Sequence, residues 1–347
     1  MTSAGPVVHT GAVAEPRRFV IQQHDATRLH WDLRLEHDGV LRSWALPRGI
    51  PWNPKENRLA VATDDHSLDF LDHEGDDADL GYGAGRLTTW DRGTFEEHKW
   101  EDDKVVVTLA GRRTAGKYAL FSMRGGRDWL IHRMDPPADE QRVPLAYGIE
   151  PMHATPGELP EGGDDWAFEP CWHGIRALVT NDTGRVVITD RRGTDISIHF
   201  PEIRRIARAL GHRELILDGV IVPTAPVGEG AGAVRHDRRG LARRMRIQSD
   251  SGARNATRTA PTVFMAVDVL WVDGRPIPGL PWDLRRRQLD DLRLDGRAWQ
   301  TSQLIGDEEA LAHVDDGIGV VAKRRDSLYE VGRVSESWIR CAGSVGR

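Results

Sequence analysis

The chain has 347 residues, 39% hydrophobic and 29% charged, so it can bury a core and is long enough for two domains. Its 47 basic and 53 acidic residues give a net charge of −6, which argues against tight non-specific binding to a long duplex. No stretch approaches the ~20 apolar residues of a membrane span. Two cysteines exclude a disulfide framework and a four-cysteine zinc site. We therefore expect a cytoplasmic protein with no membrane partner.

The N-terminal part of the chain predicts a leader followed by an all-β domain. Residues 1–16 are small, mostly apolar and nearly uncharged, so we expect them to be disordered. From 17 to 133, short alternating runs are separated by Gly, Asp or Asn clusters, a pattern typical of a compact barrel or sandwich. The predicted strands are Arg28–Glu36, Val40–Leu46, Arg58–Thr63, Gly85–Trp90, Lys104–Leu109, Lys117–Ser122 and Asp128–His132.

Polar side chains are densest in QQHDATRLHWDLRLEHDG, where residues 28–36 alternate. His30, Asp32 and Arg34 therefore share one face of a predicted strand, opposite a leucine and tryptophan face. His30 and Asp32 stand ~6.6–7 Å apart along such a strand, and His24 on the preceding turn can supply a third ligand. Two imidazoles and a carboxylate suit Mn²⁺, Fe²⁺ or Zn²⁺, and Arg34 can hold a phosphate oxygen. The alternative is a polar barrel face with ordinary salt bridges.

A longer segment, QQHDATRLHWDLRLEHDGVLRSWALPRG, resembles the signature of the 3′-phosphoesterase module at the N-terminus of bacterial ligase D proteins. The similarity continues through RLAVATDDHSLDF, YGAG and WDRGTF and covers about residues 17–133. It implies a small β-barrel enzyme that uses manganese to remove 3′-phosphates and 3′-terminal ribonucleotides from DNA ends. The family's metal ligands fall on His24, His30 and Asp32. Its phosphate contacts fall on Arg34 and His66, and its supporting basic positions fall on Arg48 and Arg58.

Three features depart from the pattern of that family. Phe70 stands where a tyrosine is usual, four residues after His66, so one hydroxyl donor to the phosphate is lost. The usual polar leader is not recognisable in residues 1–16, which bears more on ribonucleotide trimming than on phosphate removal. Arg48 replaces a lysine, which keeps the charge but alters the geometry of its contacts.

The second half of the chain predicts a linker and a mixed α and β domain. Residues 134–151 carry four prolines and no periodic pattern, so we place a linker at 134–150. In 151–347 we predict a mobile insertion over 225–261, which is rich in Gly, Ala, Arg and Ser. The predicted helices are Glu202–Leu210 and Asp283–Leu292. The predicted strands are Arg185–Asp190, Glu214–Val222 and Thr262–Val272.

From Pro151 onward, PMHATPGELPEGGDDWAFEPCWHGIRALV resembles the nucleotidyltransferase domain of ATP-dependent DNA ligases. Further matches, in the order of that family's motifs, are TDRRGTDIS, ELILDGVIV, VFMAVDVLWVDG and VVAKRRDSLYEVGRVSESWIR. The resemblance implies an α+β fold in which an unprotonated lysine attacks ATP and forms a lysyl-adenylate.

Several side chains that this chemistry requires are replaced. Cys171 stands at the position of the nucleophile, and His173 at that of the aspartate that follows it. Val220 and Ile318 stand at the positions of two metal-binding glutamates. Arg340 and Ala342 stand at those of the last motif's two lysines. Between 118 and 347 the only lysine is Lys323, which resembles a different motif. We therefore expect no covalent adenylate from ATP, and only weak nucleotide or anion binding through Arg176 and Lys323.

The sequence thus predicts a multidomain protein: a small all-β barrel followed by a degenerate α+β ligase-type nucleotidyltransferase domain without an OB-fold domain. The leading hypothesis is a Mn²⁺-dependent 3′-phosphoesterase acting on primer–template or nicked DNA ends at the bacterial nucleoid. It would work beside a separate repair polymerase, ligase and end-binding proteins. The alternatives are a non-catalytic DNA-end adaptor and, less favoured by the lysine count, an active ATP-dependent ligase.

Overall fold

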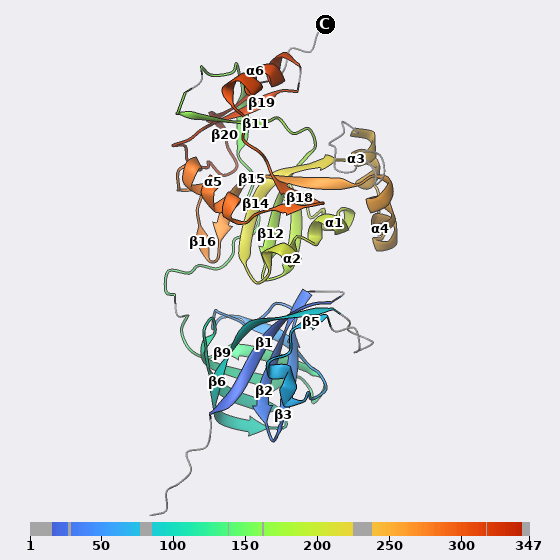
Figure 1. Cartoon of the computed structure of the whole chain (residues 1–347), viewed down its shortest axis with the longest axis vertical. Helices are drawn as coiled ribbons and strands as arrows, with labels where there is room; N and C mark the ends of the chain where they lie inside the picture. The colour runs from blue at the N-terminus through green and yellow to red at the C-terminus, as the bar shows by residue number, and fades with distance from the viewer. Residues whose placement is uncertain are drawn as a thin grey trace, which may run out of the picture. The chain divides into compact units, whose positions relative to one another are not determined.

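The structure, a computed structural model, describes residues 16–26, 29–76, 85–137, 139–161, 163–224, 238–316 and 318–341. The chain divides into two compact units, 1–138 and 139–347 (Figure 1). Nearly all of the predicted leader, most of YGAG, and Ala342 lie outside the described residues. None of the helices in the described part has the length and apolar character needed to cross a membrane.

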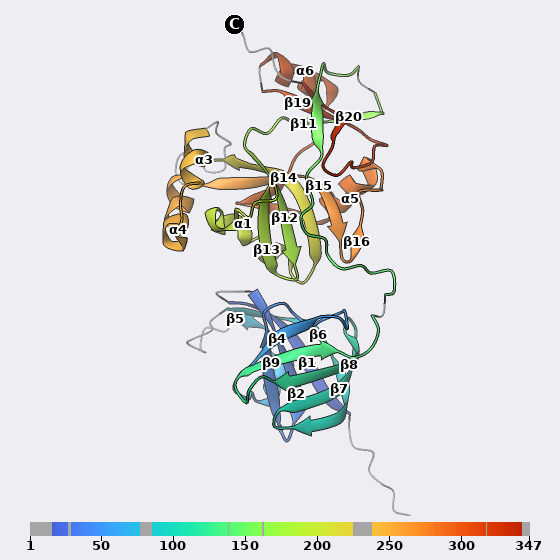
Figure 2. The same ribbon diagram turned by 180° about the vertical axis from the view of Figure 1, so that it is seen from behind.

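The first unit is an antiparallel β-barrel, as the alternating pattern predicts (Figures 1 and 2). The described strands follow the order β1-β2-β3-β4-β9-β8-β7-β6, pairing of β6 with β1 closes the sheet, and β5 lies at the edge beside β6. Their bounds are β1 Arg17–Asp25, β2 Leu29–His37, β3 Val40–Leu46, β4 Asn57–Ala62, β5 Gly75–Asp76, β6 Arg86–Glu101, β7 Lys104–Gly111, β8 Ala115–Ser122 and β9 Asp128–Arg133, with the 3₁₀ helix η1 at Leu68–Leu71.

Alternation along β1 and β2 separates an apolar from a polar face of the barrel wall. Phe19, Ile21 and Leu33 belong to the core that fills the barrel, together with the tryptophans of neighbouring strands. The opposite parity of the two strands faces outward, where Val20 packs with Leu41, Leu71 and η1 in a smaller cluster. This cluster holds η1 against the outer wall, so polar groups beside it become buried.

Two features of the barrel differ from the predicted strands. β1 is a nine-residue strand that is not among the predicted strands. β6 runs eleven residues past the predicted end at Trp90. Register shifts opposite Ile21/Gln22 and at Glu97/Lys99 let the sixteen-residue β6 bend around the barrel. Gly93 permits this path, because a Cβ there would clash with the backbone of Ala110 on β7.

The second unit contains two sheets, in agreement with the predicted mixture of α and β elements (Figure 2). The larger has the order β13-β12-β14-β15-β18-β17 with β16 beside β15, and the smaller has the order β10-β20-β19-β11. The strands are β10 His153–Pro156, β11 Trp166–Pro170, β12 Ile175–Asp182, β13 Arg185–Asp190, β14 Glu214–Pro223, β15 Thr262–Val272, β16 Arg275–Pro276, β17 Asp295–Gly296, β18 Trp299–Thr301, β19 Val320–Arg324 and β20 Val334–Cys341.

Helices flank these sheets and complete the second unit. They are η2 Ser197–His199, α1 Pro201–Arg204, α2 Ala207–Leu210, α3 Arg238–Arg244, α4 Asp250–Thr259, α5 Trp282–Asp291 and α6 Asp307–Asp315. The predicted helix Glu202–Leu210 is broken, because Arg205 and Ile206 form i→i+3 turns between α1 and α2. α5 contacts β15, and its Trp282 joins Val267 and Trp338 in a core shared by both sheets.

The prediction of a mobile insertion over 225–261 is wrong for its second part, while 225–237 lie outside the described residues. α3 and α4 are folded there, and α4 contacts α1 and η2. Arg244 explains the ordering: it is 1% exposed and donates to the carbonyls of His199 and Ala260 and to the Glu202 carboxylate. A low-complexity composition therefore conceals a buried arginine that fastens the segment to its neighbours.

The segment predicted as a linker, 134–150, divides at the boundary between the units. Leu145, Ala146 and Ile149 pack against the core of the second unit. The Val143 N–H donates to Gly274 and the Tyr147 hydroxyl donates to Asp182. The prolines prevent regular structure here but leave the chain able to bind along the surface of the second unit.

Candidate metal centre and nucleotide-binding cavity

Three side chains of β1 and β2 converge on the outer wall of the barrel. His24 and His30 are directly opposed across the two antiparallel strands, and Asp32 lies two residues beyond His30. His24 Nδ1 and His30 Nε2 each lie 3.5 Å from an oxygen of Asp32, and one ligand atom from each residue falls within 4.8 Å of the others. His24 stands on β1 rather than on the turn before β2, where the sequence prediction placed it.

The chemistry of this group fits a divalent metal. His24 Nε2 is buried and has no hydrogen-bond partner among the described residues, so the imidazole leaves a lone pair or N–H unsatisfied. Although burial raises the pKa of Asp32, the hydrogen bond from His24 and the charges of Arg34 and His30 lower it below its ordinary value. A carboxylate that stays ionised beside two imidazoles is a donor set typical of Mn²⁺, Fe²⁺ or Zn²⁺.

Arg34 lies beside the three ligands and is held by its neighbours on several sides. Its guanidinium donates to Asp32 Oδ2 at 3.1 Å, to Gln22 Oε1 at 2.8 Å and to Ser43 Oγ at 3.0 Å. The same Arg34 Nη1 is 2.8 Å from His66 Nδ1. Only 3% of Arg34 is exposed, so its orientation is fixed before any substrate arrives.

His66 completes the predicted phosphate-contacting pair. Its Nδ1 must accept from Arg34, because a guanidinium has no acceptor atom. Burial and the nearby Arg34 charge lower the pKa of His66, so the ring is neutral at pH 7 and carries its proton on Nε2. The structure therefore brings His66, Arg34 and the metal-ligand group together on one surface.

Phe70 on η1 adjoins this pair, as its position in the sequence motif indicates. Its ring centroid is 4.8 Å from that of His66 and 5.3 Å from Arg34 Cζ. The aromatic ring thus packs against both phosphate-contacting residues and offers them no hydroxyl.

Arg48 and Arg58 are connected to each other through the loop after β3. Arg58 is 2% exposed and donates to the backbone carbonyls of Arg48 and Ile50. It also forms an ion pair with Glu56 at 3.6 Å. These contacts give Arg58 a role in fixing the loop that carries Arg48.

Sequence reasoning missed two members of the site, Gln22 and Ser43. Gln22 is fully buried, accepts from Arg34 and donates through Nε2 to the carbonyls of Phe70 and His73. Ser43 contacts Arg34 and His66 from β3. Gln22 shares the strand parity of His24, so extending the alternation into β1 would have found it. Ser43 has no such signal, because only strand pairing brings it next to Arg34.

The second unit has a cavity of about 700 Å³ lined by both of its sheets and by α3. The sequence-predicted residues Cys171, His173, Arg176, Val220, Lys323 and Arg340 all line it. Arg191 also contributes, a residue that sequence reasoning did not select. Four of the changed positions, Cys171, His173, Val220 and Arg340, therefore meet in a single concave site, whereas Ile318 is not among its lining residues.

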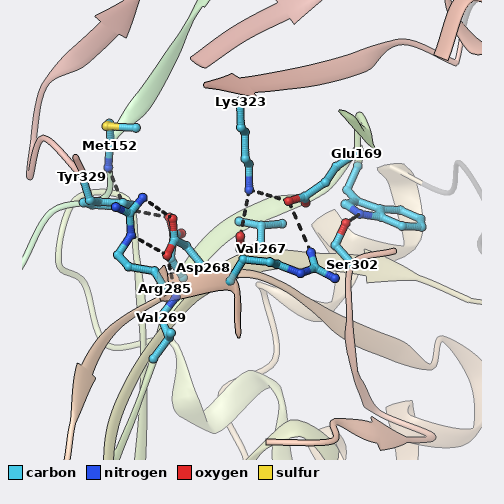
Figure 3. Close-up of polar contacts among 12 residues, drawn as sticks. Met152, Glu169, Val267, Asp268, Val269, Arg285, Ser302, Lys323 and Tyr329 are labelled. Atoms are coloured by element: carbon cyan, nitrogen blue, oxygen red, sulfur yellow. Dashed lines mark hydrogen bonds and ion pairs between the residues drawn. The ribbon is translucent and has the colours of Figure 1, made fainter. Parts of the chain in front are cut away.

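The two cations predicted to hold an anion are engaged within the protein. Lys323 Nζ donates to Glu169 Oε1 at 2.7 Å and to the Val267 carbonyl at 2.8 Å (Figure 3). Burial lowers the pKa of Lys323, while the adjacent Glu169 charge opposes this change. Arg176 forms two hydrogen bonds of 2.6 Å with Asp218, which also accepts from Tyr329.

The positions of the expected nucleophile and metal ligands have an apolar or protonated character. Burial raises the pKa of the Cys171 thiol, so it is protonated at neutral pH. Val220 packs in an apolar cluster with Val263, Met265 and other neighbours, including Trp172. Ile318 presents an aliphatic side chain, and its carbonyl lies 3.3 Å from His173 Nε2.

Comparisons with known proteins assign both units. A model of the "DNA Ligase D 3′-phosphoesterase domain" matches residues 22–122, and one of the "ATP dependent DNA ligase domain" matches residues 151–341. A Mycolicibacterium smegmatis "Multifunctional non-homologous end joining protein LigD" is 37% identical over 338 residues, covering 93% of this chain and 41% of that protein. The Pseudomonas aeruginosa protein of the same description is 27% identical, covering 93% of this chain and 43% of its own length.

The chain thus spans about two fifths of the length of these curated relatives. Among solved structures, the ligase domain from M. tuberculosis LigD is 31% identical and covers 55% of this chain and 58% of its own, with a TM-score of 0.44.

Proposed function

We propose that this chain is a Mn²⁺-dependent phosphoesterase of DNA 3′ ends whose ligase-like domain forms no adenylate. The premise is that the chain belongs to the ATP-dependent DNA ligase family and also carries a ligase D 3′-phosphoesterase domain. The convergence of His24, His30 and Asp32 beside the fixed Arg34–His66 pair carries this proposal. The substrate is a 3′-phosphate, and secondarily a 3′-ribonucleotide, on a primer–template or nicked DNA.

The residues of the barrel divide the work of this reaction. His24, His30 and Asp32 would hold the metal, and the bound metal supplies Lewis-acid polarisation of a phosphoryl oxygen. Arg34 places its positive charge beside the phosphate, in an orientation set by Gln22 and its other partners. His66 donates a hydrogen bond from Nε2 to the phosphate, because its contact with Arg34 fixes the tautomer of the ring. Arg48 is the proposed supporting cation, and Arg58 acts through the loop that carries Arg48, to whose backbone carbonyl it donates.

The side chains at the changed positions support the proposal that the ligase-like domain is inactive. The Cys171 thiol is protonated at neutral pH, and Val220 and Ile318 present no oxygen ligand from their side chains. Lys323 and Arg176 face Glu169 and Asp218, which leaves weak binding of a nucleotide or anion as their remaining role in ligand recognition.

Relatives named for non-homologous end joining support a place in bacterial DNA end repair. We place the protein in the cytoplasm at the nucleoid, where separate polymerase, ligase and end-binding proteins would act on the same DNA ends.

The phosphoesterase proposal is tested with a primer–template that ends in a 3′-phosphate, incubated with Mn²⁺ and each variant. His30→Ala should lose both phosphate release and the bound Mn²⁺, measured on the purified protein by elemental analysis. His98→Ala removes a histidine from the exposed end of β6 and serves as the matched control. Wild-type hydrolysis by His30→Ala would overturn the site assignment. A wild-type protein that binds the DNA end without hydrolysing it would favour the adaptor instead.

The second part of the proposal is tested with ATP and either Mg²⁺ or Mn²⁺, followed by intact-mass measurement. We expect no covalent AMP on the wild-type chain, and none on Cys171→Lys, because the metal-binding carboxylates would still be missing. An adduct on the wild-type protein would restore the active-ligase alternative.

A further inference from the structure

A second concave site lies on the barrel, on β6 and the turn between β7 and β8. It has a volume of about 490 Å³, within the range of small-ligand sites. We propose that this site binds the DNA strand that leads to the metal centre, with Arg112 and Arg113 holding backbone phosphates and Trp90 contacting a base. This proposal rests on the proposed function and adds the path of the substrate strand.

A buried carboxylate holds the turn that carries the two arginines. Asp91 is 4% exposed, and its Oδ1 accepts from the backbone N–H groups of Arg92 and Arg112 at 2.9 and 3.0 Å. Its Oδ2 accepts from those of Arg113 and Thr114 at 3.1 and 2.7 Å. Gly111 is required beside it, because a Cβ there would clash with the carboxylate. The position of both arginines on this turn is therefore set without any use of their guanidinium groups.

The charges of Arg112 and Arg113 remain available for an anionic ligand. In the described part of the chain neither guanidinium forms an ion pair, and both side chains are exposed. Arg92 is paired with Asp72 at 2.8 Å, and Glu74, which also lines the site, accepts from the Thr89 N–H at 3.0 Å. Three arginines against the two carboxylates of Glu74 and Asp91 give the lining residues a formal charge of +1.

An aromatic ring adjoins the two arginines. Arg113 Cζ lies 5.5 Å from the centroid of the half-buried Trp90 ring. Aromatic rings beside arginines are the combination that proteins use to bind single nucleic-acid strands, by stacking on bases and pairing with phosphates. A nucleotide strand satisfies both features at once, whereas an isolated inorganic anion would satisfy only the arginines.

The strand register places this site next to the metal centre. On β6, Leu87 is opposite His24 and Thr89 is opposite Gln22, the residue that also orients Arg34. With strands ~4.8 Å apart and residues ~3.3 Å apart along them, the Thr89 edge of the site lies about 8 Å from His24. The arginines lie further away, because Gly111, which precedes them, is opposite Gly93 on β6, and Gly93 is opposite Phe19, five residues before His24 on β1. By the same spacings this end of the site lies roughly 15–20 Å from His24. Nucleotides follow each other at ~3.4 Å along a stacked strand. The two arginines thus suit the phosphates of roughly the fourth to sixth nucleotides from the 3′ end.

The test compares Arg112→Gln/Arg113→Gln with the wild-type chain and with Arg124→Gln/Arg127→Gln, which removes two exposed arginines from the β8–β9 turn. Glutamine keeps the backbone N–H groups that bind Asp91, so the turn is preserved. For a single-stranded oligonucleotide with a 3′-phosphate, we expect KM to rise at least about tenfold with kcat unchanged. The control pair should match the wild type. Hydrolysis of p-nitrophenyl phosphate, which lacks a nucleotide chain, should be equal in all three proteins.

Binding of a 3′-hydroxyl oligonucleotide, followed by fluorescence anisotropy, separates this proposal from the proposed function. The slope of log affinity against log salt should decrease in magnitude by about 1.4 in the Arg112/Arg113 variant, for two lost phosphate contacts. An unchanged KM and slope, or an equal loss on the small substrate, would overturn the strand site. If the wild-type protein hydrolyses no substrate but the Arg112/Arg113 variant binds the oligonucleotide less tightly than the wild type, the strand site is supported and the phosphoesterase proposal is rejected.

Discussion

Replacing Lys323 with methionine tests whether this lysine stabilises the wall of the cavity in the second unit or serves only to bind an anion. Lys323 and Glu169 are each 1% exposed in their side chains, and Lys323 Nζ also lies 4.1 Å from the centroid of the Trp338 ring. Methionine keeps most of the length and the apolar contacts of the lysine but removes the charge. Glu169 is then left ionised in a buried site, and we expect the second unit to be destabilised.

The magnitude follows from the partners that remain. Removing one member of a buried ion pair costs about 3–5 kcal/mol. Arg286 Nη1 lies 3.6 Å from Glu169 Oε1 and compensates part of the loss, so we expect about 3 kcal/mol. For a unit of this size each kcal/mol lowers Tm by about 2–4 °C, which gives a decrease of about 6–12 °C. Lys323→Met/Glu169→Gln should recover more than half of it, because no unpaired charge remains.

Differential scanning calorimetry of the full chain measures this, with the transition of the first unit as an internal reference. An unchanged Tm in Lys323→Met would show that the lysine is dispensable for the fold and would refute the reasoning. A double variant no more stable than the single one would show that the loss does not come from the charge of Glu169.

Three further predictions concern the metal centre and the cysteines. Phe70→Tyr should raise phosphate release in a steady-state assay, because its ring is 5.3 Å from Arg34 Cζ and gains a hydroxyl donor; an unchanged rate would mean that the pocket already compensates. Mn²⁺ at a hundredfold excess over its Kd should stabilise the first unit by about 2.7 kcal/mol, measured by its Tm. His24→Ala should abolish this gain, and an equal gain in that variant would exclude His24 as a ligand. Since burial raises the pKa of Cys171, iodoacetamide should label it slowly at pH 7 and faster only once the pH rises above the ordinary pKa of a cysteine. Cys341, with a pKa raised to about 11 and 1% exposure, should stay unlabelled. Mass spectrometry checks both cysteines, and full labelling of Cys171 at pH 7 would contradict its protonated state.

Local patterns in the sequence determined the class of each unit and placed two of the three candidate metal ligands. A period of two residues between turn signals is sufficient to predict strands, and it identified β3 and β13 to the residue. The same period places His30, Asp32 and Arg34 on one face, because alternate side chains of any strand share a side. These properties depend only on neighbours along the chain.

Tertiary structure decided which distant groups meet. His24 faces His30 only because β1 pairs with β2 in that register, and Ser43 reaches Arg34 only from β3. Lys323 and Glu169 are 154 residues apart, and no periodicity reports that burial joins them in one ion pair. Partners of a buried charge are selected by the cost of leaving it unpaired in a medium of low dielectric constant. That cost exists only once the two sheets enclose the cavity, so the role of a charged residue could not be settled before the fold was known.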